Sequence, residues 1–286
     1  MQKFWPTIGP LLIAAWKYAW EHQLPLNLEA RGAWIKMAYK GQKDPADPAS
    51  YRPLSLLCVE YKILARAIAK RLQPIIHRLI HTDQTGFIQA RTIEENIRTK
   101  LDFLHFCEHL DDQAFATGGL YAGGIGIWDC DFSRAFDTAD TDFGIKVCLR
   151  LGLGEKYCNW IRLFYRDIWA QVLVNGQPSE RYRIAIGVRQ GCPFSPYLFN
   201  LIVEALACVV RANPNIIGFK PPCGEGWSAR TVKVQQLADD TTFYVQKVSS
   251  LRELECIIGD FGGAKKLWAF GLEPISPRTS LQNTNG

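Results

Sequence analysis

The chain has 286 residues, of which 48% are hydrophobic and 21% charged, so we expect a globular protein with a buried core and not a disordered chain. Its formal net charge of +5 arises within residues 1–110, and this basic half suggests contact with a polyanion. The nine cysteines form no C-x-x-C pair, which indicates neither a disulfide framework nor a zinc site and favours a reducing compartment, nuclear or cytoplasmic. No apolar run reaches about 18 residues, so no membrane span is expected.

The first 80 residues are predicted to combine helices with short extended segments. A helix is expected over residues 4–20, followed by an irregular segment with a short apolar strand at residues 33–37. Residues 51–57 fit either the start of a strand or a loop that docks against a core. From residue 61 to 79 the apolar side chains recur at helical spacing, and Pro74 should kink or split this helix.

The polar side of that helix carries five basic residues, which fit a solvated face and a phosphate-contacting face equally well: Lys62, Arg66, Lys70, Arg71 and Arg78. Residues 83–88 then predict a turn and an extended piece, before a helix from about Thr92. The stretch 114–126 is rich in glycine and alanine, so it is the expected joint between two domains.

A first cluster of acidic residues follows that joint. Residues 125–130 read as a buried strand, Asp131 closes it and Asp137 opens the next segment. Helices are expected at residues 142–151 and 156–169, then strands at 170–175 and 182–186 around a turn at 176–178.

A Gly- and Pro-rich loop at residues 187–196 leads into an apolar helix over residues 197–210. Its glycines allow backbone to approach a ligand, and Arg189 and Gln190 could contact a phosphate or a base edge. Taken alone, the loop fits a plain strand-to-helix connection better. A last helix is expected over residues 251–268.

A second acidic cluster lies between these two helices. Residues 237–244 predict a short β-hairpin with Asp239 and Asp240 at its tight turn. Two adjacent carboxylates repel each other unless a cation lies between them, and oxygen ligands of this kind suit Mg²⁺ or Mn²⁺. An ordinary turn without a metal is the alternative for this pair alone.

The order of elements favours an α+β protein whose sheet has helices packed on one face. Two neighbouring strands would be enough to bring Asp131 beside Asp239 and Asp240. Three carboxylates could then hold two divalent ions about 4 Å apart, which is the arrangement used for in-line displacement at phosphorus.

Five segments, in this order, resemble the motifs of the reverse transcriptase domain of LINE-type (non-LTR) retrotransposons. They are YRPLSLL at residues 51–57, DQTGF at 83–87, DFSRAFD at 131–137, GVRQGCPFSP at 187–196 and ADD at 238–240. The resemblance covers residues 8 to 280 and implies a right-hand polymerase fold. It places a fingers-like subdomain at residues 1–115 and a C-terminally truncated palm at residues 116–286.

The resemblance also implies a site and a reaction. By motif position, Asp131, Asp239 and Asp240 are the catalytic and metal-binding carboxylates, for two Mg²⁺ or Mn²⁺ ions. Phe136 lies where the family excludes a ribose 2′-OH, and Gln190 and Gly191 lie where it packs the incoming nucleotide. The triphosphate positions of related enzymes fall on Arg52 and Lys62. The implied partners are an RNA template, a DNA primer and dNTPs.

The chain departs from the family pattern at several positions, which include Arg134, Leu237, Ile275 and Arg278. It ends soon after the start of the next palm motif, so a thumb and an endonuclease domain are expected to be absent. A catalytically silent nucleic-acid-binding remnant of such a polymerase is therefore the alternative to an active RNA-directed DNA polymerase. An RNA-dependent RNA polymerase is a weaker alternative, because bulky Phe136 would crowd a ribonucleotide.

Overall fold

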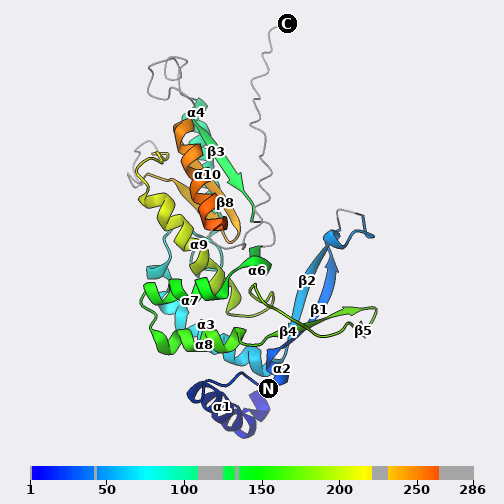
Figure 1. The fold of residues 1–286 in the computed structure, drawn as a ribbon. Helices are drawn as coiled ribbons and strands as arrows, with labels where there is room; N and C mark the ends of the chain where they lie inside the picture. Colours follow the sequence, from blue (N-terminus) through cyan, green and yellow to red (C-terminus); the bar gives the residue numbers. More distant parts are fainter. Residues whose placement is uncertain (1, 42–43, 109–124, 133–134, 221–230, 264–286) are drawn as a thin grey trace. The chain divides into compact units, whose positions relative to one another are not determined.

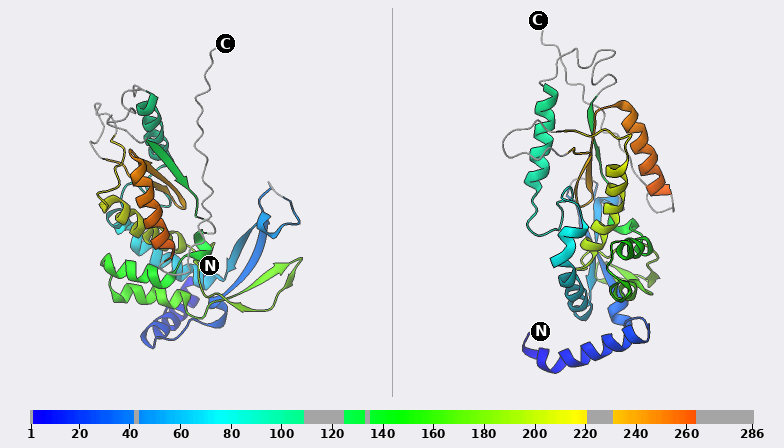
Figure 2. Two further views of the ribbon diagram at one scale, coloured as in Figure 1. Left: turned by 45° about the horizontal axis from the view of Figure 1, so that its top comes forward. Right: turned by 90° about the vertical axis from the view of Figure 1, so that its left-hand side faces the viewer.

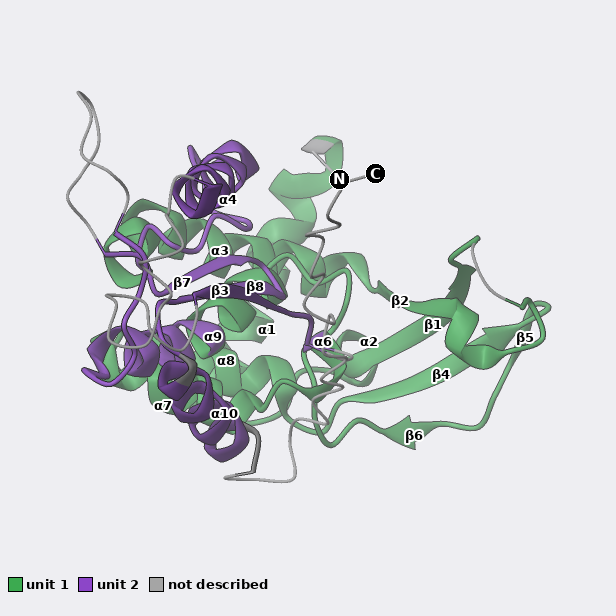
Figure 3. Ribbon diagram, turned by 90° about the horizontal axis from the view of Figure 1, so that it is seen from above, with its two compact units in different colours: residues 1–80, 136–202 green, residues 81–135, 203–286 purple. Residues whose placement is uncertain are grey.

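The computed structural model describes residues 2–41, 44–108, 125–132, 135–220 and 231–263. The chain forms two compact units, each built from two separate stretches of sequence (Figure 3). Unit 1 comprises residues 1–80 and 136–202, and unit 2 comprises residues 81–135 and 203–286. The boundary predicted between residues 115 and 116 lies outside the described residues and stays a prediction.

Unit 1 contains a five-stranded sheet (Figure 1). Its strands are β1 (Gly32–Tyr39), β2 (Tyr51–Leu57), β4 (Trp169–Val174), β5 (Gln177–Pro178) and β6 (Tyr182–Arg183). The order is β2-β1-β4-β5, with β6 also paired to β4. β1 pairs with β2 in antiparallel and with β4 in parallel orientation. The expected strand at residues 33–37 is confirmed, and the alternatives for residues 51–57 are resolved in favour of a strand.

The helices of unit 1 are α1 (Trp5–Glu21), α2 (Leu28–Arg31), α3 (Val59–Leu79), α7 (Thr141–Arg150) and α8 (Glu155–Tyr165). Short 3₁₀ turns lie at Gln2–Phe4 and Pro48–Ser50. Figure 2 shows α7 and α8 lying side by side, and they are in contact. α3 runs through Pro74, so that residue does not split the helix. Pro74 and Lys70 are exposed, which lets water solvate the backbone carbonyl that loses its amide partner.

Unit 2 contains a three-stranded antiparallel sheet in the order β3-β8-β7. Its strands are β3 (Gly126–Cys130), β7 (Val234–Leu237) and β8 (Asp240–Val245). The predicted hairpin is present, and its two-residue turn consists of Ala238 and Asp239 because Leu237 pairs with Asp240. At the free edge of β7, Gln84 forms a parallel bridge with Gln236.

Two helices of unit 2 lie on opposite sides of this sheet, α4 (Ile93–Glu108) on one and α10 (Val248–Gly263) on the other (Figure 3). The expectation that helices pack on one face is therefore wrong for this sheet. The alternation of residue types along a strand does not reveal whether one or both faces of the sheet are covered, because that depends on which helices pack against each face. Between α4 and the sheet, Phe103, Phe219, Val232 and Tyr244 form an apolar cluster.

Two helices carry the chain between the units, α6 (Ala135–Thr138) and α9 (Ser195–Ala212). α9 is long and apolar enough to cross a membrane, with a mean hydropathy of 1.3 over 18 residues. However, 61% of that segment is buried in the protein, which is usual for the core helix of a soluble protein.

Phe103 tests how much the aromatic cluster stabilises unit 2. Its ring lies edge-on to Phe219 at 5.1 Å and to Tyr244 at 5.3 Å, and only 2% of its surface is exposed. Phe103→Ala should lower the free energy of unfolding by about 3–5 kcal/mol in urea denaturation, because the cavity cannot close fully. Leu104→Ala, at a neighbouring position that is 48% exposed, is the control and should cost less than about 1 kcal/mol. Equal losses would contradict the role of this cluster.

Candidate active site

The carboxylates predicted from the sequence lie at one end of the unit 2 sheet. In the antiparallel register of β3 and β8, Cys130 pairs with Thr241. Asp131 follows Cys130 directly and Asp240 begins β8, so the two residues lie at the same end of adjacent strands, which are spaced about 4.8 Å apart. Asp239 occupies the second position of the hairpin turn and is half-buried.

The charges at this end of the sheet affect one another. Partial burial raises the pKa of the Asp240 carboxyl, and the negative charges of Asp131 and Asp129 raise it further. The Lys100 ammonium opposes this shift. Asp129 on β3 and Asp131 just after it are therefore close enough to Asp240 to disfavour its ionised form.

Asp129 was not singled out in the sequence as part of the site. Lys100 Nζ donates to both carboxylate oxygens of Asp129, at 2.8 and 2.7 Å. Thr242 Oγ1 donates to Asp129 Oδ1 at 2.6 Å. Strand alternation is the sequence feature that points to Asp129, because residues two positions apart, such as Asp129 and Asp131, lie on the same side of an extended segment.

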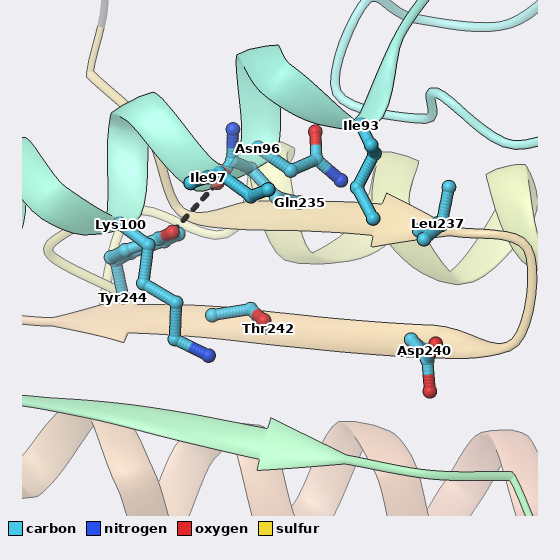
Figure 4. Close-up of a pocket in the computed structure, with 9 residues that line it drawn as sticks. All are labelled: Ile93, Asn96, Ile97, Lys100, Gln235, Leu237, Asp240, Thr242 and Tyr244. Carbon is cyan, nitrogen blue, oxygen red and sulfur yellow. Dashed lines mark hydrogen bonds between the residues drawn. The ribbon is translucent and has the colours of Figure 1, made fainter.

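A small pocket of about 160 Å³ lies between α4 and the hairpin (Figure 4). α4 contributes Ile93, Ile97 and Lys100 to its walls, and the hairpin contributes Leu237, Asp240 and Thr242. Asp240 is itself an exposed residue at one end of this pocket.

The donor atoms at this end of the sheet suit a hard divalent cation, because carboxylate oxygens that repel each other are stabilised by one. Within the described part of the chain, however, no three His, Cys, Asp or Glu side chains are arranged to hold a metal ion. Joint binding of two ions by Asp131, Asp239 and Asp240 therefore stays a prediction.

The predicted nucleotide-contacting residues all belong to unit 1, where two segments are held together by hydrogen bonds. Val188 N donates to Phe136 O at 2.6 Å, and Gln190 Nε2 donates to Asp137 Oδ1 at 3.2 Å. The Phe136 ring stacks on Phe199 with a centroid separation of 4.8 Å. The structure thus places Phe136 and Gln190 in one neighbourhood.

Gly191 brings the same loop against β2. Its φ of +91° favours glycine, and a Cβ atom there would lie 2.8 Å from Ser55 O. Tyr61 Oη and Cys192 Sγ are hydrogen-bonded at 3.2 Å, so the loop also reaches α3. Arg52 lies exposed on β2, three residues from Ser55, and Lys62 lies half-buried next to Tyr61.

The sequence left open a contact of Arg189 with a phosphate or a base edge, and the buried position of its side chain does not support this contact. Its side chain is 3% exposed, and Nη2 donates to Phe164 O at 2.7 Å. Nη1 donates to the carbonyls of Ala30 and Arg31 at 3.4 Å, and the guanidinium lies 4.2 Å from the Tyr61 ring centroid. Arg189 therefore ties together segments of unit 1, and its side chain is buried among them.

Comparison with known proteins places the chain in a family. The family described as "Reverse transcriptase (RNA-dependent DNA polymerase)" matches residues 40–267. The chain is 30% identical over 260 residues to the transposon TX1 uncharacterized 149 kDa protein of Xenopus laevis, which covers 89% of this chain and 18% of that protein. It is 32% identical over 179 residues to the Pol polyprotein from the type-1 retrotransposable element R2 of Nasonia vitripennis, covering 62% and 16%. The chain thus spans less than a quarter of the length of these relatives.

Solved structures agree at the level of the fold. Apo telomerase from Candida tropicalis superposes with a TM-score of 0.52 at 11% identity, over 93% of this chain and 47% of that one. The same telomerase in complex with a TWJ fragment of telomeric RNA gives 0.50 at 11% identity, over 91% and 42%. The expected right-hand polymerase fold is confirmed, and the chain belongs to the reverse transcriptase (RNA-dependent DNA polymerase) family, as a reverse transcriptase domain of the LINE type.

Proposed function

We propose that this chain is the catalytic domain of an RNA-directed DNA polymerase that adds dNTPs to the 3′-OH of a DNA primer on an RNA template. In each addition the primer oxygen bonds to the α-phosphorus of the dNTP, the hydroxyl proton is lost and pyrophosphate leaves. The observation that carries this proposal is the register of β3 and β8, which ends with Cys130 opposite Thr241 and so brings Asp131 to the same end of the sheet as Asp240. Family membership alone gives only the general class of reaction.

The carboxylates are proposed to hold two divalent metal ions, Mg²⁺ or Mn²⁺. Asp131, Asp239 and Asp240 supply the oxygen ligands, and the raised pKa of Asp240 supports a site that a cation stabilises. Such ions, when bound, polarise phosphate oxygens and neutralise the charge that develops during transfer. The part of this chain is to position the ligands, since positioning and charge stabilisation supply most of the catalysis in phosphoryl transfer.

The residues of unit 1 are proposed to bind the incoming nucleotide. Arg52 and Lys62 would contact its triphosphate, because a polyanion requires cations and both residues lie on segments next to the Gly191 loop. Gln190 and Gly191 would pack against it, and the Phe136 ring would exclude a 2′-OH. The stacking of Phe136 on Phe199 supports this role, because it holds the ring in place.

The alternative is a catalytically silent remnant that binds nucleic acid. It gains support from the carboxylates, because no described trio of them is arranged to hold a metal ion. A primer-extension assay separates the two, with a poly(rA) template, an oligo(dT) primer, dTTP and either Mg²⁺ or Mn²⁺. Extension by the chain supports the polymerase, whereas binding of primer–template without extension under both metal conditions supports the remnant.

In that assay Asp131→Asn should reduce extension by on the order of a hundredfold or more, because a neutral amide holds a divalent cation poorly. Asp142→Asn, at an exposed position on α7, makes the same chemical change elsewhere and should leave extension unchanged. In urea denaturation, both variants should unfold cooperatively, which shows that each is folded. Extension by Asp131→Asn close to the level of the unaltered chain would refute the assignment.

Phe136→Ala should raise the ratio of rNTP to dNTP incorporation by about tenfold or more, because removing the ring opens space at C2′ of the sugar. Phe136→Tyr, which keeps a ring of similar size, should leave the ratio low. The ratio is measured by single-nucleotide extension with dTTP and UTP. An unchanged ratio in Phe136→Ala would make Phe136 a packing residue only.

Asp240→Asn should stabilise the metal-free protein at neutral pH. Because the folded-state pKa of Asp240 is raised, its ionised form destabilises the fold above that pKa, and this cost disappears as the pH falls through it. The urea midpoint of Asp240→Asn should therefore exceed that of the unaltered chain at pH 7, with a difference that shrinks towards pH 4. Added Mg²⁺ should raise the midpoint of the unaltered chain more than that of the variant. A lower midpoint for Asp240→Asn at pH 7 would contradict the mutual repulsion.

A further inference from the structure

We propose that Gln84 is a positioning residue, which holds the hairpin turn so that Asp239 is presented in a fixed orientation. This inference rests on the proposed function, because it assigns a role in the same reaction. By sequence, Gln84 belongs to the DQTGF segment, which lies within residues 1–115, the range expected for the fingers-like subdomain. The structure places this segment in unit 2, against the strand that leads into the turn.

The Gln84 side chain bonds both backbone groups of one turn residue. Its Oε1 accepts hydrogen bonds from Ala238 N at 2.9 Å and from Gly86 N at 2.8 Å. Its Nε2 donates to Ala238 O at 3.3 Å. The side chain is completely buried, so water does not compete for these contacts.

The turn requires such support because its own sequence does not favour it. Ala238 has a φ of +58°, in the left-handed region that residues other than glycine, asparagine and aspartate rarely adopt. Of the two turn residues only Ala238 has a positive φ, and two-residue hairpin turns of this kind favour glycine at that first position. The contacts from Gln84 therefore replace the stabilisation that a favourable turn sequence would give.

The backbone around Gln84 is fixed to β7. Gln236 N donates to Asp83 O at 2.8 Å, and Thr85 N donates to Gln236 O at 2.9 Å. Gly86 passes so close to the turn that a Cβ atom there would lie 2.3 Å from Ala238 N. Any larger residue at position 86 would push the turn away, so the close approach and the hydrogen bonds act on the same residue.

Both ends of the segment are also held. At its start, the Asp83 carboxylate lies 2.9 Å from His81 Nδ1 and accepts from Arg211 Nη1 at 3.4 Å. Beyond its end, Arg91 Nη1 donates to His81 O at 2.6 Å and to Gln84 O at 2.7 Å. Gln84 is thus a rigid support, and a shift of the turn would require several buried contacts to break.

The consequence falls on Asp239, the residue next to Ala238. Fixing the N–H and C=O of Ala238 fixes the two peptide planes that flank Ala238. The second of these planes contains the backbone nitrogen of Asp239, which limits the direction in which the Asp239 side chain leaves the turn. A neutral amide does this without adding a charge near Asp239 and Asp240. Small errors in the position of a catalytic group lower the rate of reaction steeply.

The test compares Gln84→Met, which removes the amide at similar side-chain length, with Thr85→Val as the matched control. Thr85 is 3% exposed and its Oγ1 donates to Gln236 O at 3.2 Å, so this control loses a buried contact to β7 but none to the turn. Three quantities are measured on the full chain. They are hydrogen exchange at the Ala238 amide, Mn²⁺ affinity by electron paramagnetic resonance, and the single-turnover rate of primer extension with dTTP.

For Gln84→Met we expect Ala238 exchange to become at least about tenfold faster, since the amide loses its acceptor. We also expect weaker Mn²⁺ binding and an extension rate lowered by about tenfold or more, with KM for dTTP changed less than about twofold. Thr85→Val should change none of these, although its urea midpoint should fall. Gln84→Asn keeps a shorter amide, so its extension rate should fall less than that of Gln84→Met, which would support the same role. If Gln84→Met does not fold, the same three quantities are measured on Gln84→Asn, where smaller changes in the same direction are expected.

Unchanged Ala238 exchange in Gln84→Met would overturn the proposal. Faster exchange with unchanged Mn²⁺ affinity and an unchanged extension rate would overturn it as well, since Gln84 would then only stabilise the fold. Failure of the unaltered chain to extend primers would refute the proposed function. In that case Ala238 exchange and Mn²⁺ affinity still decide whether Gln84 positions Asp239.

Discussion

The antiparallel register of β3 and β8 determines which side chains can meet at the candidate active site. Side chains alternate between the faces of a strand, so this register brings Asp129 to the same face as Thr242, its direct partner. One residue of slippage would turn Asp129 to the opposite face and break its hydrogen bond with Thr242. The register is supported by packing, because the Trp128 and Phe243 rings approach to 6.0 Å and Phe243 is 1% exposed. The apolar residues of these strands therefore determine where the charges lie.

The local elements could be predicted because their signals are local. Two examples are the helix α3, predicted from the spacing of its apolar residues, and the β7–β8 turn, predicted from the residues on either side of it. Both predictions depend only on residues that are close together in the sequence. The turn after β4 was placed at residues 176–178, whereas Asn175 and Gly176 form it, each with a positive φ. Asparagine and glycine are the residues that adopt such backbone angles, whereas Gln177 and Pro178 form β5.

The pairing of β1 with β4 could not be predicted in the same way. These strands are parallel, with Ala33 opposite Ala170, and more than a hundred residues separate them in the chain. Each carries only the signal that it is a strand, and the choice of partner depends on how the whole of unit 1 packs. For the same reason, the sequence did not predict that residues 1–80 and 136–202 build one unit.

Buried polar side chains were the hardest part of the site to predict, because their partners are backbone groups from distant segments. Arg189 and Gln190 are neighbours in a loop with the composition of a ligand contact. In the structure Arg189 donates to the carbonyl of Phe164 and is buried, whereas Gln190 bonds the Asp137 side chain. Residue type alone does not distinguish these outcomes, because an arginine can donate to phosphates and to backbone carbonyls.

The residue type at position 84 follows from the charge of its surroundings. A lysine or arginine there could bond the carbonyl of Ala238 but not accept from its amide, and its charge would compete with a divalent cation for the adjacent carboxylates. A carboxylate could accept from the amide but would face the carbonyl oxygen and add to the negative charge around Asp240. Glutamine offers one donor and one acceptor without a net charge, and its length spans the gap to the turn. Of these side chains, the amide alone satisfies both groups of Ala238 while leaving the electrostatics of the carboxylates unchanged.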